Sequence, residues 1–351
     1  MKRQERKLEH LKYSLELAEG MADSGFSDVS LMHRSVSGIR PSQVDLSVEF
    51  LGKRLEAPLM INSITGGHPD TLRINRDLAA AARRTGVAMA VGSQKAALED
   101  PRVRETYAVA REENPNGVIL ANLSATCSPD EAEQAVEMIR ADGIQVHFNI
   151  PQELFMEEGD RDFDLVLPNL KRLVDSVNFP VIAKEVGFGM SGETILSLYQ
   201  AGVKTMDLAG RGGTNFISIE NARRGREKTE FEEWGIPTAI CLFEGLELGL
   251  PVTLIASGGL RTSLDLTKAL AAGAGLVAMA RPFLEMLVNG STDKLVEYIE
   301  QLKTGLARYM VMTGARSIAE LAGIPLVVTG RTAEWLTRRG VDVNAYARRK
   351  I

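Results

Sequence analysis

Short apolar runs recur along the chain, separated by segments long enough for a helix, and nearly every run ends in a polar residue or a glycine. Eight such runs, most of them followed by a predicted helix, match the arithmetic of a closed parallel barrel. We therefore predict an α/β fold, a single (β/α)8 TIM barrel. The expected strands are Pro58–Ile64, Gly86–Gly92, Gly117–Leu123, Gly143–Asn149, Pro180–Val186, Thr205–Gly210, Val252–Gly258 and Leu276–Arg281.

Apolar residues at helical spacing predict the helices. They are expected at residues 1–20, Thr71–Thr85, Asp100–Glu113, Asp130–Ala141, Phe163–Ser176, Ser191–Ala201, Thr262–Ala272, Lys294–Thr313 and Ser317–Leu321. The alternating run Val44–Phe50 predicts an antiparallel strand or hairpin before the barrel. Residues Thr214–Pro237 are mostly polar and interrupted by glycine, which is typical of a lid or a disordered segment.

These elements predict one domain, because no linker or low-complexity stretch divides residues 1–351. Residues 1–57 form an N-terminal helical and hairpin extension over the barrel mouth, and 58–325 form the barrel. Residues 326–351 are expected to be a C-terminal tail. Its basic residues are interpreted as a solvated end: Arg338, Arg339, Arg348, Arg349 and Lys350.

Composition narrows the class of protein. The chain is 44% hydrophobic, enough for a large core, and its net charge of −5 argues against non-specific binding to nucleic acid. The charged start lacks the apolar stretch of a signal peptide, and no apolar run approaches the length of a membrane span. Cys127 and Cys241 match no metal-ligand spacing. We expect a cytoplasmic protein with neither a membrane nor a nucleic acid as partner.

The fourth predicted strand carries the most informative polar pattern. In Gly143–Asn149, Gln145, His147 and Asn149 share the face opposite the apolar residues, so they point into the barrel. Buried without partners, these groups would cost a few kcal/mol. They form either an internally satisfied polar network or a ligand site. Glu153 lies just beyond, and one carboxylate together with substrate phosphates is the usual way of holding Mg²⁺.

Three other places suggest an anionic ligand. Lys184 ends an apolar strand, as either a buried cation serving an anion or a salt-bridged strand terminus. Gly258-Gly259 after strand seven and Arg281 after strand eight lie where such barrels often bind phosphate. Near the N-terminus, Arg6, Lys7 and His10 lie within one helical turn. They belong to a solvated helix or, if that helix covers the barrel mouth, to a diphosphate pocket.

The distribution of histidine and cysteine bears on the alternatives. A barrel that oxidises a hydroxy acid on a flavin normally needs a base, usually histidine, yet no histidine follows His147. A nucleotide-oxidising barrel would need a cysteine in the sixth loop, and 210–216 contain none. These absences argue against an FMN-dependent oxidoreductase of the hydroxy-acid oxidase or IMP dehydrogenase type, which we keep as the alternative function.

Several motifs resemble those of the type 2, FMN-dependent isopentenyl-diphosphate isomerases. The resemblance runs from about residue 3 to Ile324. Lys184–Met190 and Gln152-Glu153 are highly specific to that family, whereas the Gly-Gly loops occur in other FMN barrels. The remaining similar segments are Arg6-Lys7-x-x-His10, Thr65–Gly67, Val91–Gln94, Ala121–Leu123, His147–Glu153, Met156–Arg161, Gly212–Thr214 and Ala256–Gly259. Phe148 and Glu157 stand where the family usually has Leu and Pro, and neither is a predicted contact.

The resemblance implies a double-bond shift that converts isopentenyl diphosphate into dimethylallyl diphosphate in isoprenoid biosynthesis. It implies bound FMN that must be reduced, Mg²⁺ held by Glu153, and a homo-oligomer, commonly a tetramer or octamer. The implied FMN contacts are Ser63, Ile64, Thr65, Ser93, Asn122, Lys184, Thr214, Gly258, Gly259, Ala280 and Arg281. The implied substrate contacts are Arg6, Lys7, His10, Ser93, Gln94, His147, Asn149 and Gln152.

The reaction has no net redox change, which bears on the role of the flavin. No side chain in the ring of strand ends is an obvious strong acid for an unactivated alkene. We therefore expect reduced FMN to act as the acid–base catalyst, with Lys184 stabilising its anionic form and Gln152 positioning the substrate or relaying a proton. NADPH is expected to reduce the flavin without stoichiometric consumption.

Overall fold

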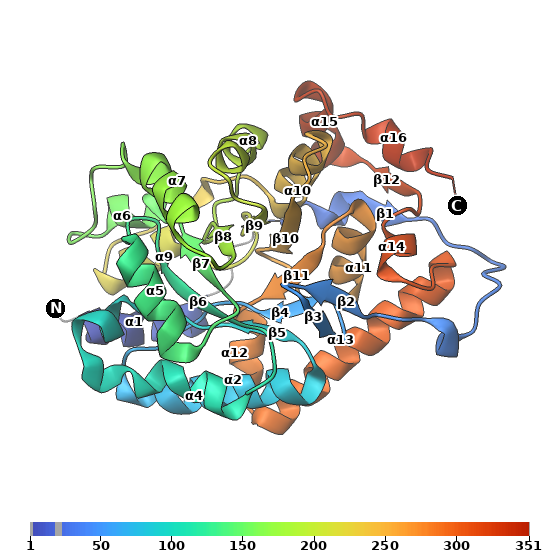
Figure 1. The fold of residues 1–351 in the computed structure, drawn as a ribbon. Helices are drawn as coiled ribbons and strands as arrows, with labels where there is room; N and C mark the ends of the chain where they lie inside the picture. Colours follow the sequence, from blue (N-terminus) through green and yellow to red (C-terminus); the bar gives the residue numbers. More distant parts are fainter. Residues whose placement is uncertain (1–2, 18–22, 351) are drawn as a thin grey trace.

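The computed structural model describes residues 3–17 and 23–350, and its central feature is a closed barrel of eight parallel strands (Figure 1). The barrel closes where β11 pairs with β4. Seven strands lie wholly within the predicted runs, and β6 extends one residue further. In spatial order they are β10 Thr253–Ser257, β11 Leu276–Met279, β4 Leu59–Ile61, β5 Ala88–Ala90, β6 Ile119–Ser124, β7 Gly143–His147, β8 Val181–Lys184 and β9 Thr205–Asp207. The prediction of a TIM barrel is confirmed.

Helices surround the barrel and bury their apolar faces against the strands. Local sequence sets their ends; for example, the Ser128 hydroxyl accepts from the Glu131 amide and caps α5. The surrounding helices are α2 Leu72–Thr85, α4 Glu105–Glu113, α5 Pro129–Ile139, α7 Val166–Ser176, α8 Gly192–Gln200, α10 Thr238–Glu247, α11 Ser263–Ala272, α12 Arg281–Val288 and α13 Thr292–Thr313. Helix α10 was not predicted, because it is buried nearly all round and shows little amphipathic spacing.

The hairpin before the barrel is present as β2 Val48–Phe50 paired with β3 Lys53–Leu55. Phe50 and Leu55 pack among apolar side chains from the starts of the barrel strands, including Met60 and Ala88. The hairpin therefore closes the amino-terminal end of the barrel. At the opposite end lies α1, Arg3–Glu16. The ends of the predicted first helix, residues 1–2 and 18–20, lie outside the described residues.

The long sixth loop is more ordered than predicted. It contains α9, Phe216–Arg223, and a short 3-10 helix, η5, Glu230–Glu233. The Asn215 side chain accepts hydrogen bonds from the first amides of α9. The Glu232 carboxylate then accepts from Ser218 and Asn221 at 2.6 and 2.9 Å and ties the two pieces together. The prediction of a lid or disordered segment missed these contacts, because they join residues across the loop.

The C-terminal tail packs on the barrel, so the prediction of a merely solvated basic end is incomplete: Arg339 is 41% exposed, yet Arg339 and Arg349 both also bind other elements. Strand β12, Leu326–Val328, pairs with β1, Val29–Leu31, near α10 and α11 (Figure 1). Helices α15, Gly330–Arg338, and α16, Val343–Ala347, follow. Arg339 donates to Glu244 on α10 at 2.9 Å, and Arg349 donates to the Ala271 carbonyl at 2.8 Å.

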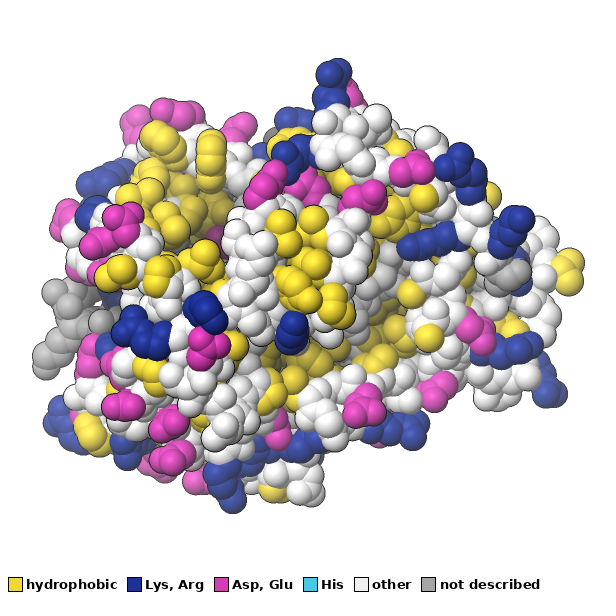
Figure 2. Space-filling view, turned by 45° about the horizontal axis from the view of Figure 1, so that its top comes forward, with side chains coloured by type: hydrophobic (Ala, Val, Ile, Leu, Met, Phe, Trp, Pro, Cys, Tyr) yellow, Lys and Arg dark blue, Asp and Glu magenta, His cyan; other side chains and the backbone are white. Residues whose placement is uncertain are grey.

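The surface and the helices bear on possible partners. On the face shown in Figure 2, acidic and basic side chains intermingle around apolar surface. Within the described part of the chain, no helix combines the length and hydropathy of a membrane span.

Candidate functional site

A cavity of about 720 Å³ opens at the carboxyl ends of the barrel strands, within the usual size range of cofactor and small-molecule sites. Its wall contains every position predicted for FMN: Ser63, Ile64, Thr65, Ser93, Asn122, Lys184, Thr214, Gly258, Gly259, Ala280 and Arg281. It also contains Glu153 and the predicted substrate positions Arg6, Lys7, His10, Ser93, His147, Asn149 and Gln152. The barrel brings together residues spread over more than 270 positions of sequence.

Gln94 is the exception among the predicted positions. It is fully buried and does not line the cavity. Its side-chain amide donates to the Ala135 carbonyl on α5 at 2.8 Å and accepts from the Asn122 amide at 3.0 Å. The Gln94 side chain therefore links β6 to α5, and the structure does not place it on a substrate.

Inside the upper barrel, Gln145 belongs to a hydrogen-bond network centred on Asp207. Gln145 donates to Asn62 at 3.1 Å and to Asp207 at 3.3 Å, and Asn62 donates to Asp207 at 2.7 Å. The Ser257 hydroxyl also donates to Asp207. The internal-network interpretation of the strand-four pattern therefore holds for Gln145, whereas His147 and Asn149 line the cavity, where the ligand-site interpretation stays a prediction.

Lys184 lies where this network meets the cavity. Its ammonium group is 3.0 Å from the Asp207 carboxylate, and Asp207 is fully buried. Lys184 is therefore a salt-bridged strand terminus that also lines the cavity. Asn62 and Asp207 escaped the sequence analysis because single polar residues in short apolar strands carry no spacing signal.

His147 is held as a neutral imidazole. Burial, together with the charges of Lys184 and Lys7, lowers its pKa to about 4. Its Nδ1 is 2.9 Å from Asn122 Oδ1, and Asn122 itself donates to Gln145 at 3.2 Å. Because Oδ1 is then an acceptor, the His147 proton resides on Nδ1 and Nε2 is a proton acceptor.

The loops after β9 and β10 pack backbone to backbone and form a cradle. A Cβ at Gly258 would lie 2.0 Å from the Gly210 carbonyl oxygen, and a Cβ at Gly259, which has φ +77°, would lie 2.5 Å from the Gly212 carbonyl. Such loops expose amide groups to an anion. On the same cavity wall, the Thr65 hydroxyl is buried and has no hydrogen-bond partner among the described residues. A buried orphan hydroxyl and an amide-rich cradle in one cavity fit a cofactor that carries both a phosphate and polar ring atoms, as FMN does.

Helix α1 lies over the mouth and adds cations to the cavity wall. Arg6 pairs with Glu158 at 3.0 Å. Lys7 donates to the Ser93 carbonyl and to the Tyr107 hydroxyl. The same helix presents His10, Leu11 and Ser14 to the cavity.

Glu153 and its neighbours form an oxygen-rich corner near α6, Ile150–Phe155. Asn149 donates to Glu153 Oε1 at 2.7 Å, and the Asp160 amide donates to Oε2 at 2.9 Å. The described residues contain no cluster of three or more histidine, cysteine or acidic side chains that could hold a metal alone. A single cavity carboxylate still fits Mg²⁺, which takes one or two protein carboxylates and completes its shell with phosphate and water.

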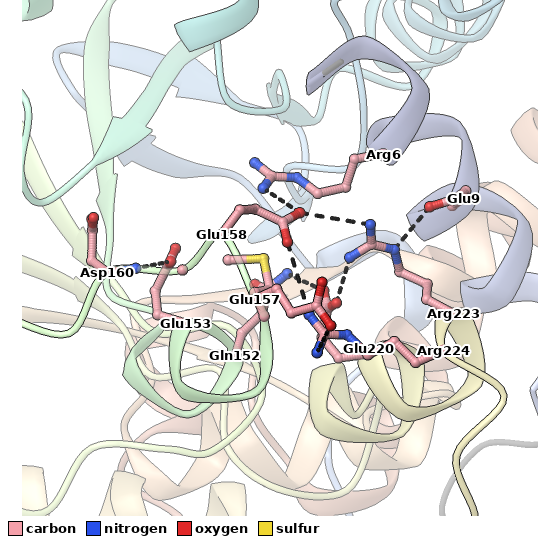
Figure 3. Close-up of polar contacts among 12 residues, drawn as sticks. Arg6, Glu9, Gln152, Glu153, Glu157, Glu158, Asp160, Glu220, Arg223 and Arg224 are labelled. Carbon is pink, nitrogen blue, oxygen red and sulfur yellow. Dashed lines mark hydrogen bonds and ion pairs between the residues drawn. The ribbon is translucent and has the colours of Figure 1, made fainter. Parts of the chain in front are cut away.

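The structure adds residues that the sequence analysis missed. Glu220 is fully buried on α9, and its Oε1 accepts from Gln152 at 3.3 Å (Figure 3). Lys95 and Glu131 form an ion pair on the cavity wall. Glu185 accepts from four successive amides, those of Val186, Gly187, Phe188 and Gly189, and so shapes the turn after β8. Glu220 could not be singled out from the sequence, because the sixth loop contains several other acidic residues.

The comparisons with known proteins agree with this geometry. Residues 101–326 match the family described as FMN-dependent dehydrogenase. The chain is similar to proteins named isopentenyl-diphosphate delta-isomerase from Moorella thermoacetica (51% identity, covering 95% of this chain and 96% of that one) and Geobacillus sp. (45%, 99% of each).

Solved structures with a similar fold include a flavocytochrome b2 variant with sulfite bound (TM-score 0.67, 20% identity, 89% of this chain and 81% of that one). Another is a lactate oxidase from Pediococcus acidilactici, with a TM-score of 0.64 and 18% identity over 93% of this chain and 94% of that one. At these identities they show the barrel fold alone. The full-length similarity at up to 51% identity decides the family. The chain belongs to the FMN-dependent isopentenyl-diphosphate delta-isomerases.

Proposed function

We propose that this chain converts isopentenyl diphosphate into dimethylallyl diphosphate, a 1,3-shift of a double bond, with reduced FMN and Mg²⁺. One observation carries the proposal: a single cavity joins the glycine cradle after β10, the cations of α1 and the Glu153 carboxylate. An FMN-dependent oxidoreductase needs the cradle but has no evident use for two further cations and a carboxylate at the mouth. The names of the full-length relatives support the same reaction.

The residues around the cradle would hold FMN. Gly258, Gly259, Ala280 and Arg281 surround the phosphate position, and Thr65, Asn122 and Lys184 offer polar atoms to the rest of the cofactor. Bound reduced FMN would supply a group that can give and take a proton. Lys184 would favour an anionic ring beside it by charge, and Asp207 keeps this cation in place at 3.0 Å.

The substrate diphosphate would bind beneath α1. Arg6, Lys7 and His10 come from the helix, and Ser93, His147 and Asn149 from the barrel. Neutral His147 can accept a proton or a hydrogen bond at Nε2 but repels no cation. Gln152 is buried with its amide on Glu220, which orients the amide at the cavity wall for positioning the substrate.

The cofactor experiment tests the proposed function directly. Purified protein should show flavin absorbance and, under anaerobic conditions, should convert isopentenyl diphosphate only after the flavin is reduced. NADPH should support many turnovers per molecule oxidised. Equal rates with oxidised and reduced flavin would contradict the proposal, and one NADPH consumed per product would favour the oxidoreductase alternative.

The metal prediction concerns Glu153. In Glu153→Gln the shape is kept and the charge is lost, so Mg²⁺ can no longer bridge the protein and the diphosphate. We expect activity to fall by about two orders of magnitude or more while flavin absorbance stays normal. Activity measured across a Mg²⁺ titration, with Glu157→Gln on the exposed side of the same loop as control, checks this. Loss of flavin with unchanged Mg²⁺ dependence would assign Glu153 another role.

Assembly and location belong to the same proposal. We propose a cytoplasmic homo-oligomer, a tetramer or octamer. Light scattering on the FMN-loaded protein measures the number of copies, and a monomer at micromolar concentration would contradict it.

A further inference from the structure

We propose that Arg223 is a positioning residue that clamps α1 over the cavity and turns Glu220 toward His10 and Gln152. Figure 3 shows Arg223 with Glu9 and Glu220. Its importance for turnover rests on the function proposed above, whereas the clamp itself is a property of the fold. The Arg223 side chain lies on α9 and is only 6% exposed.

Three acidic side chains from three segments surround the Arg223 guanidinium. Nε donates to Glu9 on α1 at 2.9 Å, and Nη1 donates to Glu220 on its own helix. Nη2 is 3.7 Å from Glu158, in the segment after α6, and Arg6 pairs with the same Glu158 oxygen at 3.0 Å. Arg223 therefore links α1, α9 and the wall that carries Glu153.

Glu220 completes a second link between the same two helices. Arg223 occupies its Oε2, which leaves Oε1 for His10 Nε2 at 2.8 Å and Gln152 Nε2 at 3.3 Å. Because Glu9 and His10 are neighbours on α1, the two links fix both the position and the rotation of that helix. Burial raises the pKa of Glu220, but the His10 hydrogen bond and the nearby charges of His10 and Arg223 lower it overall, so the carboxylate is ionised.

The composition of α1 makes these polar contacts decisive. Its aliphatic side chains are Leu8, Leu11 and Leu15, and none of them is fully buried. Apolar packing alone therefore stabilises the docked helix only weakly. An arginine suits the clamp because its planar fork presents nitrogens in three directions, whereas a lysine has a single ammonium group.

Two variants and one control test the clamp. Glu9→Ala removes the partner of Arg223 on α1. Glu9 does not line the cavity, and alanine has a high helix propensity. Loosening of α1 in this variant would therefore report the loss of the Arg223 contact. Arg223→Lys keeps the charge without the fork. Arg224→Ala is the control, because Arg224 pairs with Glu157 at 3.2 Å and Glu158 at 3.9 Å, both outside α1.

We expect hydrogen exchange of the amides in residues 3–16 to rise about tenfold in E9A and R223K and to stay unchanged in R224A. The KM of E9A for isopentenyl diphosphate should rise about tenfold with kcat within about twofold. R223K should also lose kcat, since Glu220 is released. The flavin spectrum should be normal in all three variants.

Exchange and KM of E9A equal to those of R224A would overturn the clamp. The exchange comparison needs no substrate. A wild-type protein that fails to isomerise the substrate when reduced would therefore count against the proposed function, and the exchange data would still decide whether Arg223 holds α1.

Discussion

At the scale of single residues, the site controls proton positions mainly by burial. His147 is kept neutral between two cations, Lys184 and Lys7. Glu185, one residue after Lys184, shows the opposite effect of burial on an acid: its pKa rises to about 7 although four amides donate to it. A strand end thus carries groups whose charge states are set by where the strand places them and not by their residue type.

The pH dependence of stability tests the neutral state of His147. Between pH 6.5 and about 4 the unfolded chain takes up a proton at this residue and the folded chain does not. The contribution is therefore fully present above pH 6.5 and is lost as the pH falls. From pH 7 to pH 5, wild type should lose about 2 kcal/mol more stability than His147→Gln.

Urea unfolding of both proteins at equal flavin content measures this difference. Glu185 acts in the opposite direction, because an acid with a raised pKa stabilises the fold at low pH and this effect is lost as the pH rises through about 7. Its contribution cancels between the two proteins. The same loss in wild type and H147Q would show that His147 is not held neutral.

At the scale of elements, the glycine cradle proposed to hold the FMN phosphate depends on two loops that touch backbone to backbone. Gly258 has φ +95° and no room for a Cβ beside the Gly210 carbonyl. Gly249 also has a positive φ, +60°, but nothing lies within 4 Å of its Cβ position. An alanine at Gly249 would suffer only the strain of a positive φ, whereas an alanine at Gly258 would also collide with the Gly210 carbonyl. Comparing the two variants therefore distinguishes the cost of backbone strain from the cost of crowding.

We expect Gly249→Ala to cost about 1 kcal/mol, the penalty of the left-handed conformation, with normal FMN content. Gly258→Ala should cost at least about 2 kcal/mol more, because the loops must separate, and should lose most bound flavin. Thermal unfolding and the ratio of flavin to protein absorbance report both effects. Full flavin content in G258A would show that the cradle is not the phosphate site.

The N-terminal helix α1 is the second element with residues on the cavity wall. Deletion of residues 1–10 removes Arg6, Lys7 and His10 from the cavity but leaves every barrel strand. We expect a folded, FMN-loaded barrel with badly impaired turnover. Each lost charge-assisted contact is worth roughly 1.5–3 kcal/mol, so KM should rise at least about tenfold for each. Near-normal kinetics of the truncated protein would instead show that α1 is a solvated helix without a role in substrate binding.

At the scale of the whole molecule, the two ends of the chain are joined on the barrel. Strands β1 and β12 pair across about three hundred residues, and Arg339 fastens α15 to α10 through Glu244, which is 5% exposed. Arg339→Ala leaves that buried carboxylate with the Gly192 amide at 2.9 Å. We expect a loss of about 2 kcal/mol in the free energy of unfolding.

The neighbouring Arg338 is a matched control, because its ion pair within the described part of the chain is with Glu334, on the surface of its own helix. Arg338→Ala should change stability by less than about 0.5 kcal/mol. Chemical denaturation of the two variants checks the difference. Equal stability of R338A and R339A would mean that the Arg339–Glu244 contact contributes little to the stability of the fold.

The sequence by itself determined the barrel and most of the cavity wall. Strand period and turn glycines are local signals, and the carboxyl ends of parallel barrel strands always meet at one end of the barrel. Lys184, His147 and Gly258 could therefore be placed from the sequence. Gln94 was misplaced, because a polar residue beside a strand end can face either the cavity or a helix, and only the hydrogen bonds to Ala135 and Asn122 settle which.

Only the tertiary structure decided the contacts that span long stretches of sequence. Arg223 meets Glu9 across 214 residues and Arg339 meets Glu244 across 95. In the sequence each of these residues is an ordinary charge on a helix. The closure of the barrel brings α1 next to α9 and the tail next to α10, and so determines which charges pair. No local period or spacing in the sequence predicts these contacts.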